Sequence, residues 1–412
     1  MDPSALSDID LAGTVAGVVS EPRRDPADSF VLHAPLELLA RVALLSRVRP
    51  ANRDAARARI VDIATKLDAF GPPVERPPAA SFATAADAAG YLAAAVERGE
   101  VDDADASAAW LGDHAAPVEL ASLLGDAVVA RLAAAGHAPI FLAHWPGVSP
   151  RGEITGSLLR PLARALAEEP VPRITWVDRS DHGPSKASAS ASPDSDRPTV
   201  PSLFEAIAAC PHLGRPTIDF IAPIMQRVDG DDIAALLGPP VADQRVGLAA
   251  ASREVLRAAA WSMILEPGAH SPYLWSHCLT MPQAVLAIAP LAQQPARHLA
   301  VAATHVTAFR SAFAARPLVP AFDAPAPELR LADAIDTGQE VAAAAAWHIG
   351  AEGRAAMVDE LVNRAAVHED AHLVKYTLAC LDAAATDPDG ARLYLAAAAS
   401  LSGWWATDDS AA

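Results

Sequence analysis

Cysteine, lysine and aromatic residues are scarce in this sequence of 412 residues, and long apolar runs are missing. The three cysteines, Cys210, Cys278 and Cys380, are widely spaced without a Cys-x-x-Cys pair, which argues against a disulfide framework and a cysteine-based zinc site. Because no apolar run approaches the roughly 18 residues that a bilayer requires, we expect no membrane-spanning helix. The first residues lack the basic region of a signal peptide, and we therefore expect a cytoplasmic protein.

Positive charge is also in short supply. Acidic residues outnumber basic ones by 50 to 32, which gives a formal net charge of −18. Nucleic acids and anionic membranes both favour clustered lysine and arginine, so neither is an expected partner. The glycine-rich loops that bind dinucleotides or nucleoside triphosphates are absent, and so is the G-x-S-x-G motif of hydrolases. If NADPH or ATP binds, it does not bind through these common loops, and the oligomeric state stays open.

What the sequence has in abundance is alanine and leucine, with apolar residues recurring at intervals of three and four. Alternating β-strand patterns and hairpin turns are nearly absent. The pattern predicts an all-α, multi-helix globular fold in which many of the 35 prolines separate short helices. The predicted helices span residues 35–45, 52–70, 84–98, 102–111, 117–135, 154–168, 202–210, 217–237, 245–265, 329–348, 352–367, 370–384 and 388–400, with a denser apolar block at 272–315.

Composition divides the chain into two helical parts. Residues 180–201 are rich in Ser, Ala, Pro and Asp and too poor in large apolar groups to form a core, so we predict a low-complexity linker or surface insertion there. Residues 1–179 and 202–412 are predicted to be helical and to contribute to one shared site, with proline-rich connectors at 71–82 and 315–330.

Several histidines stand in apolar surroundings, where they are candidates for a site. His33 and His277 each precede a proline that we expect to begin a helix, and His144 lies in a His-Trp-Pro-Gly segment that is typical of a turn. Each has a structural alternative, a histidine whose ring is bound to a backbone carbonyl. His298 and His305 are seven residues apart, a spacing that also fits a polar stripe on one helix.

The strongest local signal is the segment HEDAHLVKYTLACLDAA at 368–384. Lysine occurs only three times in the chain, and Lys66 and Lys186 lie in ordinary polar surroundings. Lys375 lies three residues after His372, on the same helix face, within an apolar run. A lysine buried there must be neutral, paired or chemically modified, because a bare buried ammonium is costly. The structural alternative is that its long stem carries the amine to water.

One chemical interpretation of this segment is a zinc metalloprotease. Residues 368–372 spell H-E-x-x-H, in which two histidines one helical turn apart bind zinc. Zinc proteases of this type use a further glutamate downstream as a ligand, and no glutamate occurs after Glu369. The extended form of the motif, H-x-x-G-x-x-H, is also missing, because Lys375 and Leu378 occupy its glycine and histidine positions. We therefore place the protease interpretation behind the next one.

A second interpretation comes from a family resemblance. HEDAHLVKYTLACL resembles the C-terminal helix of the questin oxidase-like family, in which an acidic turn precedes a His-x-x-Lys pair. FVLHAPLELLARVAL and WSHCLTMPQAVLAI resemble that family's N-terminal and central histidine segments, and the three matches occur in the family's order. The resemblance implies a helical oxidoreductase of secondary metabolism that acts on anthraquinone-type polyketides, with non-haem iron held by four histidines and a carboxylated lysine.

Carried over by position, the implied metal ligands are His33, His277, His372 and Lys375. The fourth histidine departs from the family pattern, because Gly156 stands where the resemblance leads us to expect it. Either His144 substitutes for it or the site is depleted. A carboxylated lysine beside neutral imidazoles suits Fe²⁺ or a similar divalent metal. The resemblance alone implies NADPH, and Trp275 is a candidate wall for a flat substrate.

Two functions follow as expectations. The first is a metal-dependent oxygenase that uses O₂ to oxidise or cleave a quinonoid aromatic ring. The second is a catalytically silent helical relative that binds a ligand or a protein partner. Bound metal distinguishes them, since the first requires about one iron per chain and the second requires none.

Overall fold

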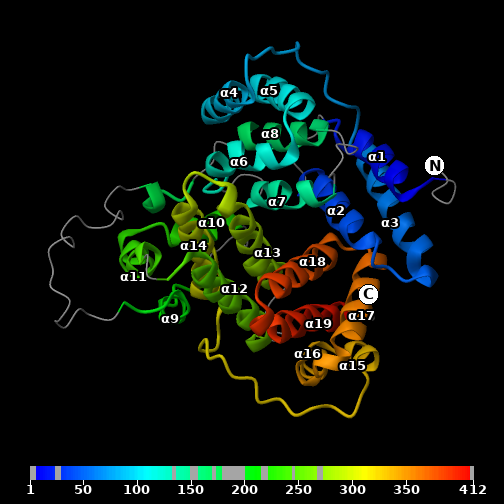
Figure 1. Cartoon of the computed structure of the whole chain (residues 1–412), viewed down its shortest axis with the longest axis vertical. Coiled ribbons are helices and arrows are strands. Elements are labelled where there is room, and N and C mark those ends of the chain that lie inside the picture. Colours follow the sequence, from blue (N-terminus) through cyan, green and yellow to red (C-terminus); the bar gives the residue numbers. More distant parts are fainter. Residues whose placement is uncertain are drawn as a thin grey trace.

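The computed structural model describes residues 6–23, 29–131, 136–148, 156–168, 173–178, 200–214, 221–243, 246–266 and 272–408. Over these ranges the chain forms nineteen α-helices, joined by connections and short 3-10 turns (Figure 1). The described residues contain no β-strand, only the isolated bridges Arg23–Pro73 and Arg131–Arg173. The all-α prediction is thus confirmed, whereas the predicted linker at 180–201 lies outside the described residues up to position 199.

The helices follow one another with few long connections. They are α1 (Asp8–Val19), α2 (Ser29–Leu45), α3 (Pro50–Asp68), α4 (Ala85–Arg98), α5 (Val101–His114), α6 (Pro117–Val128), α7 (Ala138–Val148), α8 (Leu159–Glu168), α9 (Leu203–Ala208), α10 (Ile221–Arg227), α11 (Asp231–Ala242), α12 (Leu248–Leu265), α13 (Pro272–Ile288), α14 (Pro295–Phe313), α15 (Leu331–Thr337), α16 (Gln339–His348), α17 (Arg354–Val367), α18 (Ala371–Thr386) and α19 (Ala391–Asp408).

Local end signals explain several of these boundaries. The Thr84 side chain caps α4 by accepting a hydrogen bond from the Asp87 backbone, and Gly99 ends that helix with the left-handed φ of 70° that glycine adopts most easily. Ser202 and Glu205 form a reciprocal capping box at α9. In both places the predicted and observed helix ends agree within about a residue.

Two prolines that were expected to begin helices do not do so. We expected helices to begin at Pro35 and Pro282, but both prolines lie inside longer helices, α2 and α13. His33 and His277 are consequently helical residues and do not precede a helix. Each proline costs its helix one backbone hydrogen bond, and packing against neighbouring helices compensates for that loss.

Further differences concern weak or interrupted patterns. Helices α1 and α7 were not predicted, and α7 includes the His-Trp-Pro-Gly segment that was expected to be a turn. The predicted helix at 217–237 is divided between α10 and α11, and that at 329–348 is broken at Gly338. Gly338 has a φ of 135°, which an L side chain rarely adopts, so it ends one helix and begins the next.

Four helices that are distant in sequence surround the centre of the molecule. α2 packs on α7, α7 on α13, α13 on α18, and α18 on α2, which closes a ring (Figure 1). The first two come from the N-terminal part of the chain and the last two from the C-terminal part. Residues nearly 350 positions apart in the sequence therefore meet at one place.

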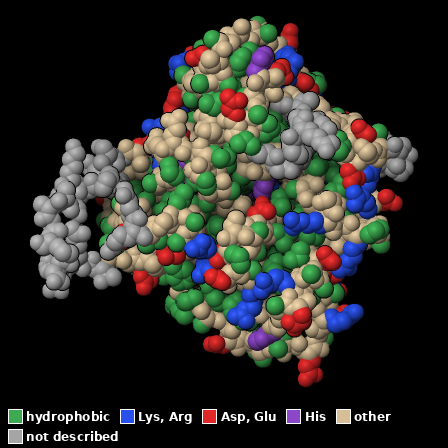
Figure 2. Space-filling model, viewed as in Figure 1, with side chains coloured by type: hydrophobic (Ala, Val, Ile, Leu, Met, Phe, Trp, Pro, Cys, Tyr) green, Lys and Arg blue, Asp and Glu red, His purple; other side chains and the backbone are tan. Residues whose placement is uncertain are grey.

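The described helices include none that is both long and apolar enough to cross a membrane. On the face shown in Figure 2, acidic and basic side chains are intermixed over the surface. No broad basic patch is seen on this face, in keeping with the net charge of −18.

Helices α16 and α19 make an unusually close contact. Both are rich in alanine, and Gly403 of α19 faces Gly338 and Ala342. A Cβ atom added at Gly403 would lie 2.7 Å from the backbone carbonyl oxygen of Gly338 and 2.9 Å from the Ala342 Cβ. Such separations are shorter than van der Waals contact, so only glycine fits between the helices in this arrangement.

This contact predicts that Gly403→Ala destabilises the protein by about 1–3 kcal/mol, because the added methyl group forces the helices apart. A matched control is Gly17→Ala, since nothing lies within 4 Å of the position of a Cβ at that helical glycine. The control should be neutral or stabilising by about 0.5–1 kcal/mol. Urea unfolding followed by circular dichroism measures both, and equal stability of the two variants would contradict the close packing.

Candidate metal centre

The ring of four helices brings four histidines together. His33 lies in the second turn of α2, His137 immediately before α7, His277 in α13 and His372 in the first turn of α18. The His33 ring centroid lies 4.5 Å from that of His137 and 5.0 Å from that of His372. The His277 ring centroid lies 5.4 Å from that of His137 and 5.0 Å from that of His372, so each ring has two neighbours. Figure 2 shows a histidine reaching the surface near the middle of the face.

Three of the rings have nitrogens close enough to share one ion. In His33, His137 and His277 the candidate ligand atoms all lie within 4.8 Å of one another. The Nε2 atoms of His33 and His137 are 3.0 Å apart. Two imidazole nitrogens bound to one metal at about 2.1 Å, with about 90° between them, lie about 3.0 Å apart. The spacing therefore fits a pair of ligands on one divalent ion, and it also fits a hydrogen bond between two neutral rings.

His372 is oriented by a carboxylate. Its Nδ1 atom lies 2.9 Å from Asp370 Oδ1, and the same oxygen accepts a hydrogen bond from the His372 backbone N–H at 2.6 Å. Asp370 is also the N-cap of α18, so one residue begins the helix and fixes the ring. An Nδ1–H donated to a carboxylate leaves Nε2 as the metal-binding atom, an arrangement common in metal centres.

The electrostatics favour the neutral form of His33 and His372, the form that a metal ligand requires. Burial, with a further contribution from the charge of Lys375, lowers the pKa of His372 to about 4. The same two causes lower the pKa of His33 well below its usual value. Burial alone would raise the pKa of Asp370, but the hydrogen bonds that it accepts from the ring and the backbone N–H of His372 bring it below its ordinary value.

Lys375 lies one turn after His372 and is 2% exposed. Its amine is shielded from water and has no hydrogen-bond partner among the described residues, so its stem does not carry the amine to the surface. Burial lowers the pKa of Lys375 to about 8, although the carboxylates of Asp370 and Glu37 oppose that shift. Roughly a tenth of this amine is thus unprotonated and nucleophilic at pH 7, far more than for an ordinary lysine.

A buried ion pair in α2 includes Arg41, which also joins α2 to the connection between α17 and α18. Glu37 and Arg41, both in α2, lie 2.6 Å apart and are 5% and 2% exposed. Arg41 also donates hydrogen bonds to the carbonyl oxygens of Ala366, His368 and Glu369. These carbonyls belong to the end of α17 and the connection that leads into α18. Arg41 therefore holds the start of α18, with His372 and Lys375, against the helix that carries His33.

Not every candidate from the sequence joins the cluster. His144 is buried two turns beyond His137, with its Nδ1 atom 4.0 Å from Asp382. Burial and the charge of Lys375 lower the pKa of His144 to about 4, so it borders the same region. Within the described ranges, however, the close group of three histidine rings includes His137 and does not include His144. Gly156 begins a 3-10 turn before α8.

His137 is the residue that sequence reasoning missed. A signal for it was present, because the tripeptide His-Ala-Pro occurs at 33–35 and again at 137–139. The first copy lies within α2 and the second leads directly into α7, which begins at Ala138, so apolar helical residues follow both. The second copy was overlooked because α7 itself was not predicted.

The remaining candidates have structural surroundings. His368 follows the last residue of α17 with an extended backbone, and its ring packs on Trp405. Residues 368–372 therefore do not form the continuous helix that an H-E-x-x-H zinc site requires. Trp275 is buried in the core at 2% exposure, and on α13 it points about 160° away from His277.

His298 and His305 are fully buried, which contradicts a polar stripe. His298 is satisfied by the Val285 carbonyl and Asp126. Both residues therefore belong to the core of the C-terminal part.

Comparisons with known proteins add no relative: no family model, no curated protein and no solved structure matches the chain.

The buried pair predicts the effect of Arg41→Met. The substitution leaves the Glu37 carboxylate buried without its partner, so the free energy of unfolding should fall by about 3–5 kcal/mol. In the double variant Glu37→Gln, Arg41→Met a large part of that loss should be recovered. Arg330→Met removes an exposed pair with Asp333 and should have no measurable effect. Urea unfolding decides, and an unchanged midpoint for Arg41→Met would contradict the anchoring role.

The buried histidines predict that stability falls in mild acid. Burial lowers the pKa of His33, His144, His305 and His372, the latter three to about 4, 3 and 4. Below about pH 6.5 the unfolded chain binds protons that the folded chain excludes, which lowers the free energy of unfolding by about 1.4 kcal/mol per pH unit per histidine. Burial raises the pKa of Asp382 to about 6, which opposes this trend with one proton only.

The measurement is the free energy of unfolding between pH 7 and about 4 in the presence of a chelator. His305→Leu removes one of these protons and should flatten the slope. A profile that is flat or rises toward acid pH would contradict the burial of neutral histidines.

Proposed function

We propose that this protein is a metal-dependent oxidoreductase, a non-haem iron oxygenase acting on a quinonoid aromatic compound. The observation that carries the proposal is the meeting of four histidines and one unpaired buried lysine at the centre of the four-helix ring. Imidazoles with open positions beside a carboxylate-like oxygen are typical of iron sites that activate oxygen. The resemblance to the questin oxidase-like family supports the aromatic substrate.

The residues present fit such an ion. His33, His137 and His277 form the close group that would hold it. His372 lies outside that close group but borders it, with its ring centroid 5.0 Å from those of His33 and His277, and it would complete the set, with Asp370 keeping it in the metal-binding tautomer. His137 fills the place of the fourth histidine, which the sequence left open between His144 and a depleted site. A bound ferrous ion would supply the one-electron chemistry that a closed-shell protein side chain lacks.

Lys375 completes the donor set if it is carboxylated. The lone pair of its unprotonated amine attacks the carbon of dissolved CO₂, the amine loses one proton, and a carbamate with one negative charge results. This reaction replaces a costly buried cation with an anionic oxygen ligand. The lowered pKa of Lys375 and the absence of a hydrogen-bond partner for its amine in the described part of the chain both favour that reaction.

The first test is the metal content of the purified protein and of its Lys375 variants. The wild-type protein should carry about one iron per chain, whereas a metal-free protein with an intact fold would favour a silent relative that binds a ligand or partner. Lys375→Ala should lose the metal, with partial restoration by acetate. Lys375→Arg should lose it equally, because a guanidinium cannot form a carbamate and remains positive.

Lys66→Arg is the matched control, since Lys66 is exposed on α3. It should retain the wild-type metal content, and circular dichroism should show that all of the variants are folded. Wild-type iron in Lys375→Arg would end the ligand role of Lys375. Wild-type protein grown with ¹³C-labelled CO₂ should also show a carbamate carbon by NMR that is missing in Lys375→Ala.

A further inference from the structure

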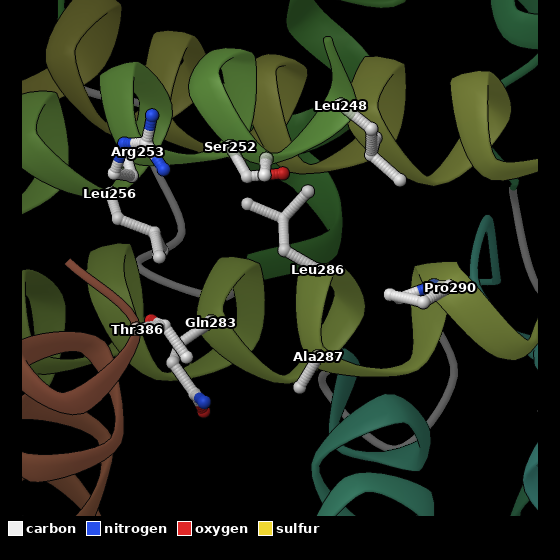
Figure 3. A pocket seen from close by; sticks show the side chains of 10 residues that line it. Leu248, Ser252, Arg253, Leu256, Gln283, Leu286, Ala287, Pro290 and Thr386 are labelled. Atoms are coloured by element: carbon white, nitrogen blue, oxygen red, sulfur yellow. The ribbon is translucent and has the colours of Figure 1, made fainter.

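A cavity of about 370 Å³ lies between α12 and α13, apart from the histidine cluster (Figure 3). On α13, Leu286 follows His277 by nine residues, which places the two side chains about 180° apart around the helix. The cavity therefore opens on the opposite side of α13 from the four histidines. Its lining includes residues from α12, from α13 and from the end of α18.

The lining of this cavity changes in character from one end to the other. Figure 3 shows Leu248 and Pro290 at one end and Ser252 and Leu286 in the middle. Toward the other end lie the polar side chains of Arg253, Gln283 and Thr386, together with Leu256. An apolar chamber with a few polar groups at one end is typical of sites for amphipathic small molecules.

Arg253 is the exceptional residue of this cavity. It is half-buried, and within the described ranges it forms no hydrogen bond or ion pair. Arg257, one turn later on α12, is paired by contrast: its guanidinium donates to both carboxylate oxygens of Asp387, each at 2.7 Å. In a chain with an excess of 18 negative charges, an arginine left unpaired beside an apolar cavity has its donors free for an anion from outside.

We propose that this cavity binds a small amphipathic monocarboxylate, with its carboxylate on Arg253 and its apolar body against Leu248, Leu286 and Pro290. The planar guanidinium matches a carboxylate with two parallel hydrogen bonds. The volume lies at the lower end of the range of small-molecule sites, which suits a ligand of one or two rings or a short alkyl chain. The site is independent of metal, because none of its lining residues belongs to the cluster.

The probes are naphthalene-2-carboxylate and its neutral analogue naphthalene-2-carboxamide, measured by isothermal titration calorimetry on the full chain. The carboxylate should bind with one site per chain, and the carboxamide should bind about tenfold or more weakly, since it lacks the charge-assisted hydrogen bonds. Arg253→Gln should weaken the carboxylate to the level of the carboxamide. Leu286→Trp fills the cavity and should abolish binding of both.

Two controls separate binding at this cavity from a general effect of charge and from the proposed metal centre. Arg354 is exposed and, in the described structure, likewise unpaired, so Arg354→Gln removes the same charge and should leave the affinity unchanged. His277→Ala should retain carboxylate binding even where metal is lost, which separates this site from the proposed oxygenase centre. The proposal is overturned if the carboxamide binds as tightly as the carboxylate, if Arg253→Gln has no effect, or if Leu286→Trp still binds.

Discussion

The burial of the Lys375 amine without a hydrogen-bond partner among the described residues is the constraint around which the centre of this protein is organised. A charged ammonium there would be costly, and its charge contributes to lowering the pKa of His33, His144 and His372. These histidines and the lysine consequently depend on one another, because a positive charge on one of them disfavours a positive charge on the others. The cluster is therefore most easily buried with its members neutral.

Hydrogen bonds hold the start of α18 in place beside this cluster. Asp370 accepts one hydrogen bond from the His372 ring and one from its backbone N–H, and Arg41 binds three carbonyls at the end of α17 and in the connection to α18. Both residues act on the first turn of α18, where a small rotation would move His372 and Lys375 together. Rigid placement of the donors lowers the reorganisation needed when an ion or substrate is bound.

Much of this architecture could be predicted from the sequence, for identifiable reasons. The three-and-four periodicity of alanine and leucine fixes the all-α class, and the His-x-x-Lys spacing puts His372 and Lys375 on one helix face because that relation is local. His33 and His277, which the sequence singled out, lie beside His372 through tertiary packing, and their role as ligands stays a prediction. The starts of their helices were wrong, because packing around α2 and α13 outweighs the cost of an internal proline.

The features that could not be predicted depend on contacts between residues that are distant in the sequence. His137 precedes a helix with a weak pattern, and only the closing of the ring between α2 and α13 reveals which of the histidines near α7 faces the others. The unpaired state of Arg253 is of the same kind, since it depends on which side chains do not approach it.

The four-helix ring also sets the order of events during synthesis. His33 and His137 precede His277 in the sequence, and His372 and Lys375 follow all three, so the members of the ring are synthesised in that order. Until α18 has been made, the ring stays open between α13 and α2. An ion that needs all four rings can be captured only after α18 has packed on α2 and α13, so metal loading of such a centre would report that the ring has closed.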